Sequence, residues 1–149
     1  MAEAASLETR VRLEIYRSLI EDGRAPTVAE AAATLEVSEP DVDASYRSLA
    51  DGHAVVLRPG TLDVWMAPPL SAVPTSFRVE VDGDGWWGNC VWDAAGVLAM
   101  LGRPGDVRTT CPDCGEPLSL QVDGERVTGD GVGHFAVPAA RWWEDIGFT

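Results

Sequence analysis

The residues best suited to chemistry are a cysteine and an aspartate three positions apart, Cys90 and Asp93. If a helix begins near Asn89, the two side chains share one face, where a thiol and a carboxyl can approach each other. The free amides and positive dipole at a helix start favour a thiolate, whereas apolar surroundings disfavour an ionised aspartate. The pair therefore suits soft-metal binding with proton transfer. The spacing also fits a commoner arrangement, a buried structural cysteine beside a capping aspartate.

Two further cysteines, Cys111 and Cys114, form a C-x-x-C motif, which is half of a typical zinc site. A complete structural zinc site needs two more ligands, and the candidates are Cys90, His53, His134 and carboxylates. A redox dithiol is the alternative, but the motif lies between two predicted strands and lacks the helix that activates thioredoxin-type thiols. The motif is interpreted as a metal-bound knuckle or a tight turn. His134 lies in an apolar run and is predicted to be a core histidine.

Other common chemistries have no support in the sequence. It contains no Gly-Lys-Ser/Thr phosphate loop, no G-x-S-x-G motif and no paired histidines for a catalytic zinc. Three tryptophans, Trp86, Trp87 and Trp92, surround the cysteine segment. They are interpreted as aromatic core, with the wall of an apolar pocket as the alternative.

The composition limits the classes of partner. The chain has 149 residues and a formal net charge of -13, and its 11 basic residues are all arginine. Such a charge repels phosphate backbones, so we do not expect nucleic acid as a partner. No stretch approaches the ~20 apolar residues of a membrane span, and the N-terminus lacks the apolar core of a signal peptide. We therefore expect a cytoplasmic protein, whose three cysteines serve thiol or metal chemistry rather than a disulfide framework.

The elements that position these residues fall into two regions. Apolar spacing and capping residues predict three helices within 7–49, followed by a hairpin formed by 53–57 and 62–66. This order is typical of a winged helix, expected over residues 1–67. Its third helix carries more acids than arginines, so we interpret the region as structural or dimerising rather than DNA-binding.

Pro68, Pro69 and Pro74 predict a linker, and residues 75–149 are expected to form the second domain. Alternating apolar residues predict several strands there, and the apolar segment that ends at Leu101 predicts a helix buried on most sides. The expected fold class is α+β, with an N-terminal three-helix winged-helix-like region and a mixed β-sheet domain that holds a buried helix.

The order of these features resembles the organomercurial (alkylmercury) lyases. That family pairs a winged-helix-like region with a mixed α/β domain, and its core carries an aromatic lead-in before Cys-x-x-Asp at the start of a buried helix. Residues 86–93 match this segment. Residues 107–120 look like the family's next stretch, a strand, a structural cysteine, a glycine, a proline and an alternating strand. The resemblance covers most of the chain loosely and is specific in these two segments.

The resemblance implies protonolysis of carbon–mercury bonds, in which Cys90 is a mercury-binding thiolate and Asp93 is the proton donor. It makes Cys111 structural and Cys114 an additional thiol that could relay the metal, so Cys90, Cys111 and Cys114 are the expected metal ligands. No cofactor is required, since mercury is part of the substrate and product. The expected partners are an organometal or soft metal ion and small cytosolic thiols, and zinc at Cys111 and Cys114 is the further metal expectation.

One departure from the family pattern concerns its second catalytic cysteine. By the same comparison this residue falls at, or just after, the position following Thr149, so the second domain is expected to be C-terminally truncated or to have lost it. A second copy of the chain could complete the core, which makes a homodimer an expectation. Two alternatives to an enzyme stay open, a non-catalytic thiol-based heavy-metal binding protein and a metal-sensing winged-helix regulator.

Overall fold

The computed structural model describes residues 5–129 and 131–147, in which a helical N-terminal part is followed by antiparallel sheets. The expected α+β class is confirmed. The elements are α1 (Leu7–Glu21), α2 (Val28–Leu35), α3 (Glu39–Asp51), β1 (Val56–Leu57), β2 (Val64–Ala67), β3 (Leu70–Ser71), β4 (Arg78–Val81), β5 (Asp84–Trp87), α4 (Val91–Leu101), β6 (Gly105–Thr110), β7 (Pro117–Asp123), β8 (Arg126–Gly129) and the 3₁₀ helix η1 (Ala139–Glu144).

Each of the first three helices begins at a capping side chain. Ser6 and Ser38 accept hydrogen bonds from backbone N–H groups of α1 and α3, and Thr27 with Glu30 forms the expected capping box of α2. In α3 the side chain of Arg47 pairs with Asp43 at 2.6 Å. This pairing reduces the positive charge that α3 could offer to a phosphate backbone.

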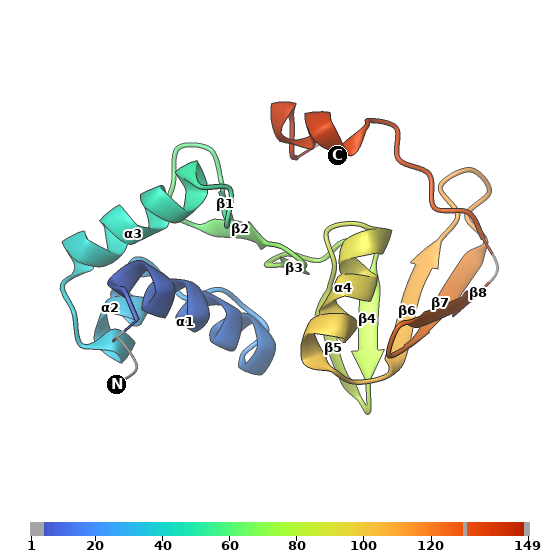
Figure 1. Ribbon diagram of the computed structural model, residues 1–149, viewed down its shortest axis with the longest axis horizontal. Coiled ribbons are helices and arrows are strands. Elements are labelled where there is room, and N and C mark those ends of the chain that lie inside the picture. Colours follow the sequence, from blue (N-terminus) through green and yellow to red (C-terminus); the bar gives the residue numbers. More distant parts are fainter. Residues whose placement is uncertain (1–4, 130, 148–149) are drawn as a thin grey trace.

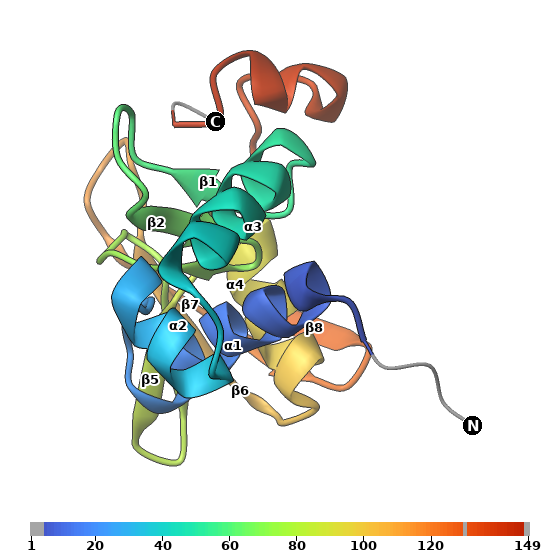
Figure 2. The ribbon, with the colours of Figure 1, turned by 90° about the vertical axis from the view of Figure 1, so that its left-hand side faces the viewer.

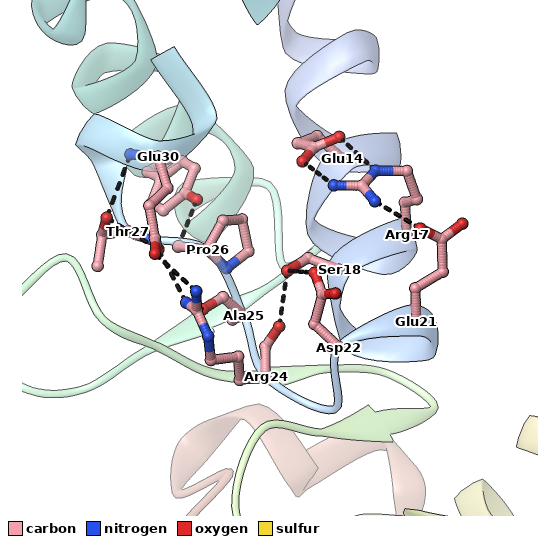
Figure 3. A network of polar contacts seen from close by, with 11 residues as sticks. Glu14, Arg17, Ser18, Glu21, Asp22, Arg24, Ala25, Pro26, Thr27 and Glu30 are labelled. Atoms are coloured by element: carbon pink, nitrogen blue, oxygen red, sulfur yellow. Dashed lines mark hydrogen bonds and ion pairs between the residues drawn. The ribbon is translucent and has the colours of Figure 1, made fainter. Parts of the chain in front are cut away.

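A polar network ties α1 to the start of α2 (Figure 3). Ser18 Oγ donates to the carbonyl oxygen of Arg24 at 2.9 Å, and Arg24 forms a salt bridge of 2.6 Å with Glu30. Glu14 is buried in α1 and pairs with Arg17 at 2.6 Å, so its charge is compensated. These contacts hold the N-terminal helices together, and these helices support one side of the site.

The hairpin expected after the helices is present, formed by the antiparallel strands β1 and β2. The segment expected as a linker instead contains a strand, because β3 pairs with β2 and Leu70 also forms a bridge to Gly88. Leu70 is 1% exposed. The chain between the two regions is therefore hydrogen-bonded on both sides, with its apolar side chain in the core.

The larger sheet has the strand order β5-β4-β6-β7-β8. Every pairing described in it is antiparallel, which makes it simpler than the mixed sheet that we expected. The turn between β4 and β5 uses Asp82 and Gly83 at positive φ, as tight hairpin turns require. Alternate strand residues enter the core, among them Val79, Val107 and Val122.

Helix α4 packs against this sheet with one face only. Ala94, Val97 and Leu98 are buried, whereas Trp92 is 70% exposed and Met100 is 41% exposed. The expectation that α4 is buried on most sides is therefore wrong. Its residues are apolar nearly throughout, but one sheet covers only one face of a helix, and apolar composition alone does not show how many neighbours a helix has.

Figure 1 shows α1–α3 at one end of the molecule and the larger sheet at the other, with α4 between them. After β8 the C-terminal segment (red) crosses the top of the molecule, back over α4 toward the helical part, and Figure 2 also shows it at the top. Buried side chains from both parts form one hydrophobic cluster. Among the described residues, no helix combines the length and apolar character needed to cross a bilayer.

Candidate active site

The start of α4 places the sulfur of Cys90 beside the first turn of the helix. Cys90 is the N-cap residue, one position later than the helix start that we expected, and its Sγ accepts the backbone N–H of Asp93 at 3.4 Å. Sulfur here takes the role that a serine or aspartate oxygen usually has. Residues 90 and 93 are therefore in contact through the Asp93 backbone, and the approach of the thiol to the carboxyl stays a prediction.

The ionisation of Cys90 differs from our expectation. Burial is the main cause that raises the pKa of its thiol, and the negative charge of Asp93 raises it further. The backbone N–H groups of Asp93 and Trp92 act in the opposite direction, but they do not compensate. A helix start alone therefore does not make this cysteine a thiolate, and a metal that binds the sulfur has to displace a proton.

The carboxyl of Asp93 is held by its neighbour one turn earlier. Nδ2 of Asn89 donates to Oδ2 of Asp93 at 2.9 Å. Burial raises the pKa of Asp93, and the Asn89 hydrogen bond lowers it by a smaller amount. The expected shift of Asp93 toward its protonated form is confirmed, with desolvation as its cause.

Asn89 also connects the site to strand β3. Its Nδ2 lies 3.4 Å from the carbonyl oxygen of Pro69 and 3.3 Å from that of Leu70. Its Oδ1 is buried and has no hydrogen-bond partner within the described part of the chain. In the sequence Asn89 marks only the helix start, and its positioning role cannot be predicted there because the two carbonyl groups come from a distant segment.

Cys90 and Asp93 both face a cavity of about 510 Å³. Its walls come from the start of α4, from the region around β2 and β4, and from the C-terminal segment. The lining residues are Met66, Pro68, Phe77, Asn89, Cys90, Val91, Asp93, His134, Phe135, Ala136, Val137, Trp142, Trp143, Ile146 and Gly147. Most are apolar, so the cavity combines a few polar groups with an apolar surround, as small-molecule sites do.

His134 is a residue whose role we misjudged. It is exposed and lines this cavity, so the prediction of a core histidine is wrong. The apolar residues that follow it, Phe135 to Val137, line the cavity too instead of entering the main core. A local apolar run does not distinguish these two environments, because apolar side chains line an open cavity as well as fill a core.

The C-terminal segment is attached to the helical part by aromatic contacts. The ring of His53 stacks on Trp143 with the centroids 3.9 Å apart and the planes at 5°. Gly147 lies so close to Trp65 that an added Cβ would be 2.9 Å from that ring. His53, a candidate zinc ligand from the sequence, therefore makes a ring contact that helps hold the cavity wall in place.

The side chain of Asp93 also lines a second concave surface. A shallow groove of about 490 Å³ between α1 and α4 is lined by Arg12, Tyr16, Pro68, Pro69, Trp92, Asp93, Gly96 and Met100. The hydroxyl of Tyr16 donates to the carbonyl oxygen of Pro68 at 2.7 Å and so fixes the wall between cavity and groove. The carboxyl thus lies between two concave surfaces.

The tryptophans near Cys90 do not line the cavity. Trp86 is buried and donates its Nε1 hydrogen to the carbonyl oxygen of Ile20 at 3.0 Å, which ties the sheet to α1. Trp87 lies under the guanidinium of Arg78, 4.8 Å from the ring centroid. The aromatic side chains of the cavity instead include Trp142 and Trp143.

Cys111 and Cys114 lie in the turn between β6 and β7, away from the cavity lining. Within residues 5–129 and 131–147, no group of three or more His, Cys, Asp or Glu residues is arranged to hold a metal ion. The expected set of Cys90, Cys111 and Cys114 is therefore not assembled as one site. The expected zinc at Cys111 and Cys114 likewise finds no third ligand in this part of the chain.

Comparisons with known proteins point in one direction. A family model described as alkylmercury lyase matches residues 70–148. An alkylmercury lyase of Streptomyces lividans is 37% identical over 59 residues, which are 40% of this chain and 27% of that protein. The crystal structure of the mercury-bound form of MerB2 has a similar fold, with a TM-score of 0.62 and 20% identity over 81% of this chain and 57% of that one. This chain thus spans about a quarter of the curated relative's length and just over half of the solved one.

Proposed function

Because the chain belongs to the alkylmercury lyase family, we propose that it cleaves carbon–mercury bonds by protonolysis, with Cys90 as the mercury ligand and Asp93 as the proton donor. One observation carries this proposal. A thiol and a carboxyl, both with raised pKa values, face one largely apolar cavity at the start of α4. The mercury in the related MerB2 structure adds support, since a soft metal suits a thiolate ligand.

The first step is capture of an organomercurial bound to a small thiolate, R–Hg–SR′. The sulfur of Cys90 forms a bond to mercury and releases its proton, and the carboxylate of Asp93 in the same cavity accepts that proton. Mercury then carries the organic group and two sulfurs, with one negative charge on the complex. The raised pKa of Cys90 means that this proton is available when mercury arrives.

The second step breaks the carbon–mercury bond. The electron pair of that bond stays with carbon, which takes the proton from Asp93 and leaves as the hydrocarbon R–H. Mercury remains as Cys90–S–Hg–SR′, and Asp93 is again a carboxylate. Burial raises the pKa of Asp93 and so favours the protonated form that this step needs.

The cavity contributes positioning and a largely apolar surround. Asn89 orients the Asp93 carboxyl through the hydrogen bond of 2.9 Å, and the apolar side chains around it receive the organic group. A second small thiol then exchanges with Cys90, giving Hg(SR′)₂ and the free Cys90 thiol. No cofactor takes part in this scheme.

The test is incubation with a phenylmercury salt and excess small thiol, with benzene measured in the headspace. We expect benzene from the unaltered chain, none from Cys90→Ser, and none from Asp93→Asn, which keeps the shape of the side chain but cannot donate an acidic proton. Asp84→Asn is the control, since Asp84 is an exposed strand residue outside the cavity. Benzene release by Asp93→Asn at the unaltered rate would contradict the proton-donor assignment.

A second candidate is a thiol-based heavy-metal binding protein without catalysis. It is favoured by one observation, that Cys90 is the sole cysteine lining the cavity among the described residues. This candidate predicts that phenylmercury stays bound to Cys90 in excess thiol and that benzene is not formed. Protein-bound phenylmercury measured by intact mass would separate it from the lyase.

A further inference from the structure

The turn that carries Cys111 and Cys114 is closed by backbone hydrogen bonds. The N–H of Cys111 donates to the carbonyl oxygen of Glu116 at 2.8 Å, and the N–H of Gly115 donates to the carbonyl oxygen of Cys111 at 2.8 Å. Gly115 has φ of 74°, a left-handed conformation that glycine adopts without strain. The turn therefore holds both cysteines on one short, defined loop.

Within this loop Cys111 and Cys114 lie three positions apart, inside the turn that the bond from Gly115 to Cys111 closes. Cys114 is exposed and Cys111 is partly exposed, so a ligand can reach both sulfurs from solvent.

The loop lies at the same end of the sheet as the cavity. Helix α4 ends at Leu101 and β6 begins at Gly105, so the strand runs back along the helix toward its start. Cys111, which follows β6, is therefore on the side of the sheet where Cys90 precedes α4. Figure 1 shows the β6–β7 loop and the start of α4 at the upper end of the larger sheet.

The number of ligands selects the kind of metal. A structural zinc ion takes four ligands, and the described residues offer no third one beside this pair. A soft ion with a strong preference for sulfur, such as Hg(II), is satisfied by two thiolates. We propose that Cys111 and Cys114 form a second metal site, a dithiol that chelates inorganic Hg(II) independently of Cys90.

Chelation is a thiol exchange that needs no oxidant or reductant. Hg(SR′)₂ reacts with the two thiols to give Cys111–S–Hg–S–Cys114 and two molecules of R′SH. This inference rests on the proposed function in one respect only, the source of the Hg(II), because Hg(SR′)₂ is the product of the proposed reaction. The site itself requires nothing from the cavity, so it binds Hg(II) that is supplied directly.

The test uses the Cys90→Ser variant of the full chain, in which the cavity thiol is removed. The variant is reduced, mixed with HgCl₂ and excess small thiol, and separated by gel filtration, and mercury is measured by elemental mass spectrometry. We expect retention of about one Hg(II) per chain. Adding Cys111→Ser or Cys114→Ser to this variant should cause loss of Hg(II) at roughly 100-fold less competing thiol, since a single thiolate has no chelate advantage.

Asp113→Asn in the Cys90→Ser variant is the matched control, because it changes the same loop without removing a thiol and should retain mercury. Two results would overturn the proposal: no mercury on Cys90→Ser, or equal retention after either loop cysteine is replaced. Circular dichroism checks that each variant is folded. Failure of the proposed lyase function appears separately, as absence of benzene, and leaves the mercury measurement valid.

Discussion

The side chain of Asn89 donates to Oδ2 of Asp93 at 2.9 Å while its own Oδ1 is buried without a partner among the described residues. A buried oxygen without a hydrogen-bond partner costs free energy. The hydrogen bonds that the Nδ2 group donates offset this cost and hold the side chain in its orientation. That group faces Asp93 and two carbonyl oxygens of the segment around β3. The asparagine thus links a distant segment to the carboxyl that we assign as proton donor.

Replacing Asn89 with Ala should raise the pKa of Asp93 further. The hydrogen bond from Asn89 stabilises the ionised carboxyl, and without it the effect of burial is unopposed. The pKa can be followed by NMR titration of the Asp93 side-chain carboxyl carbon. Ser119→Ala, at an exposed strand position, is the control. A lower or unchanged pKa in Asn89→Ala would show that the hydrogen bond does not act on Asp93.

Asp93→Asn should stabilise the fold in a pH-dependent way. The pKa of Asp93 is raised in the folded state, so both states hold the proton below the unfolded pKa and the residue then carries no penalty. Between the unfolded pKa and the folded pKa, the unfolded chain releases this proton while burial makes the folded chain retain it, so the free energy of unfolding falls as the pH rises. The gain from Asp93→Asn should grow over this range and then level off. Urea midpoints at several pH values measure it, and a pH-independent difference would contradict the assignment.

Benzene release should depend on pH in a bell shape. The proposed reaction needs one proton shared by the Cys90–Asp93 pair, and this form predominates between the two raised pKa values. Activity should fall on the acid side when both groups are protonated, because no base then accepts the thiol proton. It should fall on the alkaline side when neither holds a proton. A rate that keeps rising with pH would show that the acid is not required.

Gly88→Ala should damage both stability and activity. Gly88 lies against the first turn of α4, and an added Cβ would be 2.5 Å from the backbone nitrogen of Ala94 and 2.6 Å from its Cα. Backbone has to move to relieve this contact, which costs about 1–3 kcal/mol of unfolding free energy and displaces the site. Gly133→Ala is the matched control, since its Cβ would meet only Val91 at an ordinary 3.8 Å. Denaturant unfolding measures both variants, and equal stability would contradict the close approach.

His53 and Trp143 should be energetically coupled. Their stacked rings join the end of α3 to the C-terminal segment, and such pairs contribute about 0.5–1.5 kcal/mol beyond the area that they bury. A double-mutant cycle with His53→Ala and Trp143→Ala measures the coupling in the free energy of unfolding. We also expect faster amide hydrogen exchange around η1 in each single variant. Additive effects of the two changes would show that the stack contributes nothing.

Much of the fold could be predicted because its signals are local. The capping box of Thr27 and Glu30 and the cap at Ser38 mark helix starts that the structure has at the same positions. Alternating residues such as Leu118, Leu120 and Val122 predict β7 equally well. The burial of α4 was misjudged, since the number of neighbours that cover a helix depends on tertiary packing.

The site was predictable in part for the same reason. Cys90 and Asp93 are brought together by three positions of helix geometry, which the sequence contains. The exposure of His134 and the stacking of His53 on Trp143 depend on how the C-terminal segment crosses the molecule. No local pattern encodes these contacts. The pKa of Cys90 was misjudged because the helix start was considered without the burial around it.

The walls of the cavity have separate origins along the chain. Met66 and Pro68 line it, yet both precede residue 70, where the match to the alkylmercury lyase model begins. The segment with Cys90 and Asp93 lies inside that match. A change at the end of β2 can therefore alter the space beside Cys90 and Asp93, to which we assign the reaction, without changing either residue.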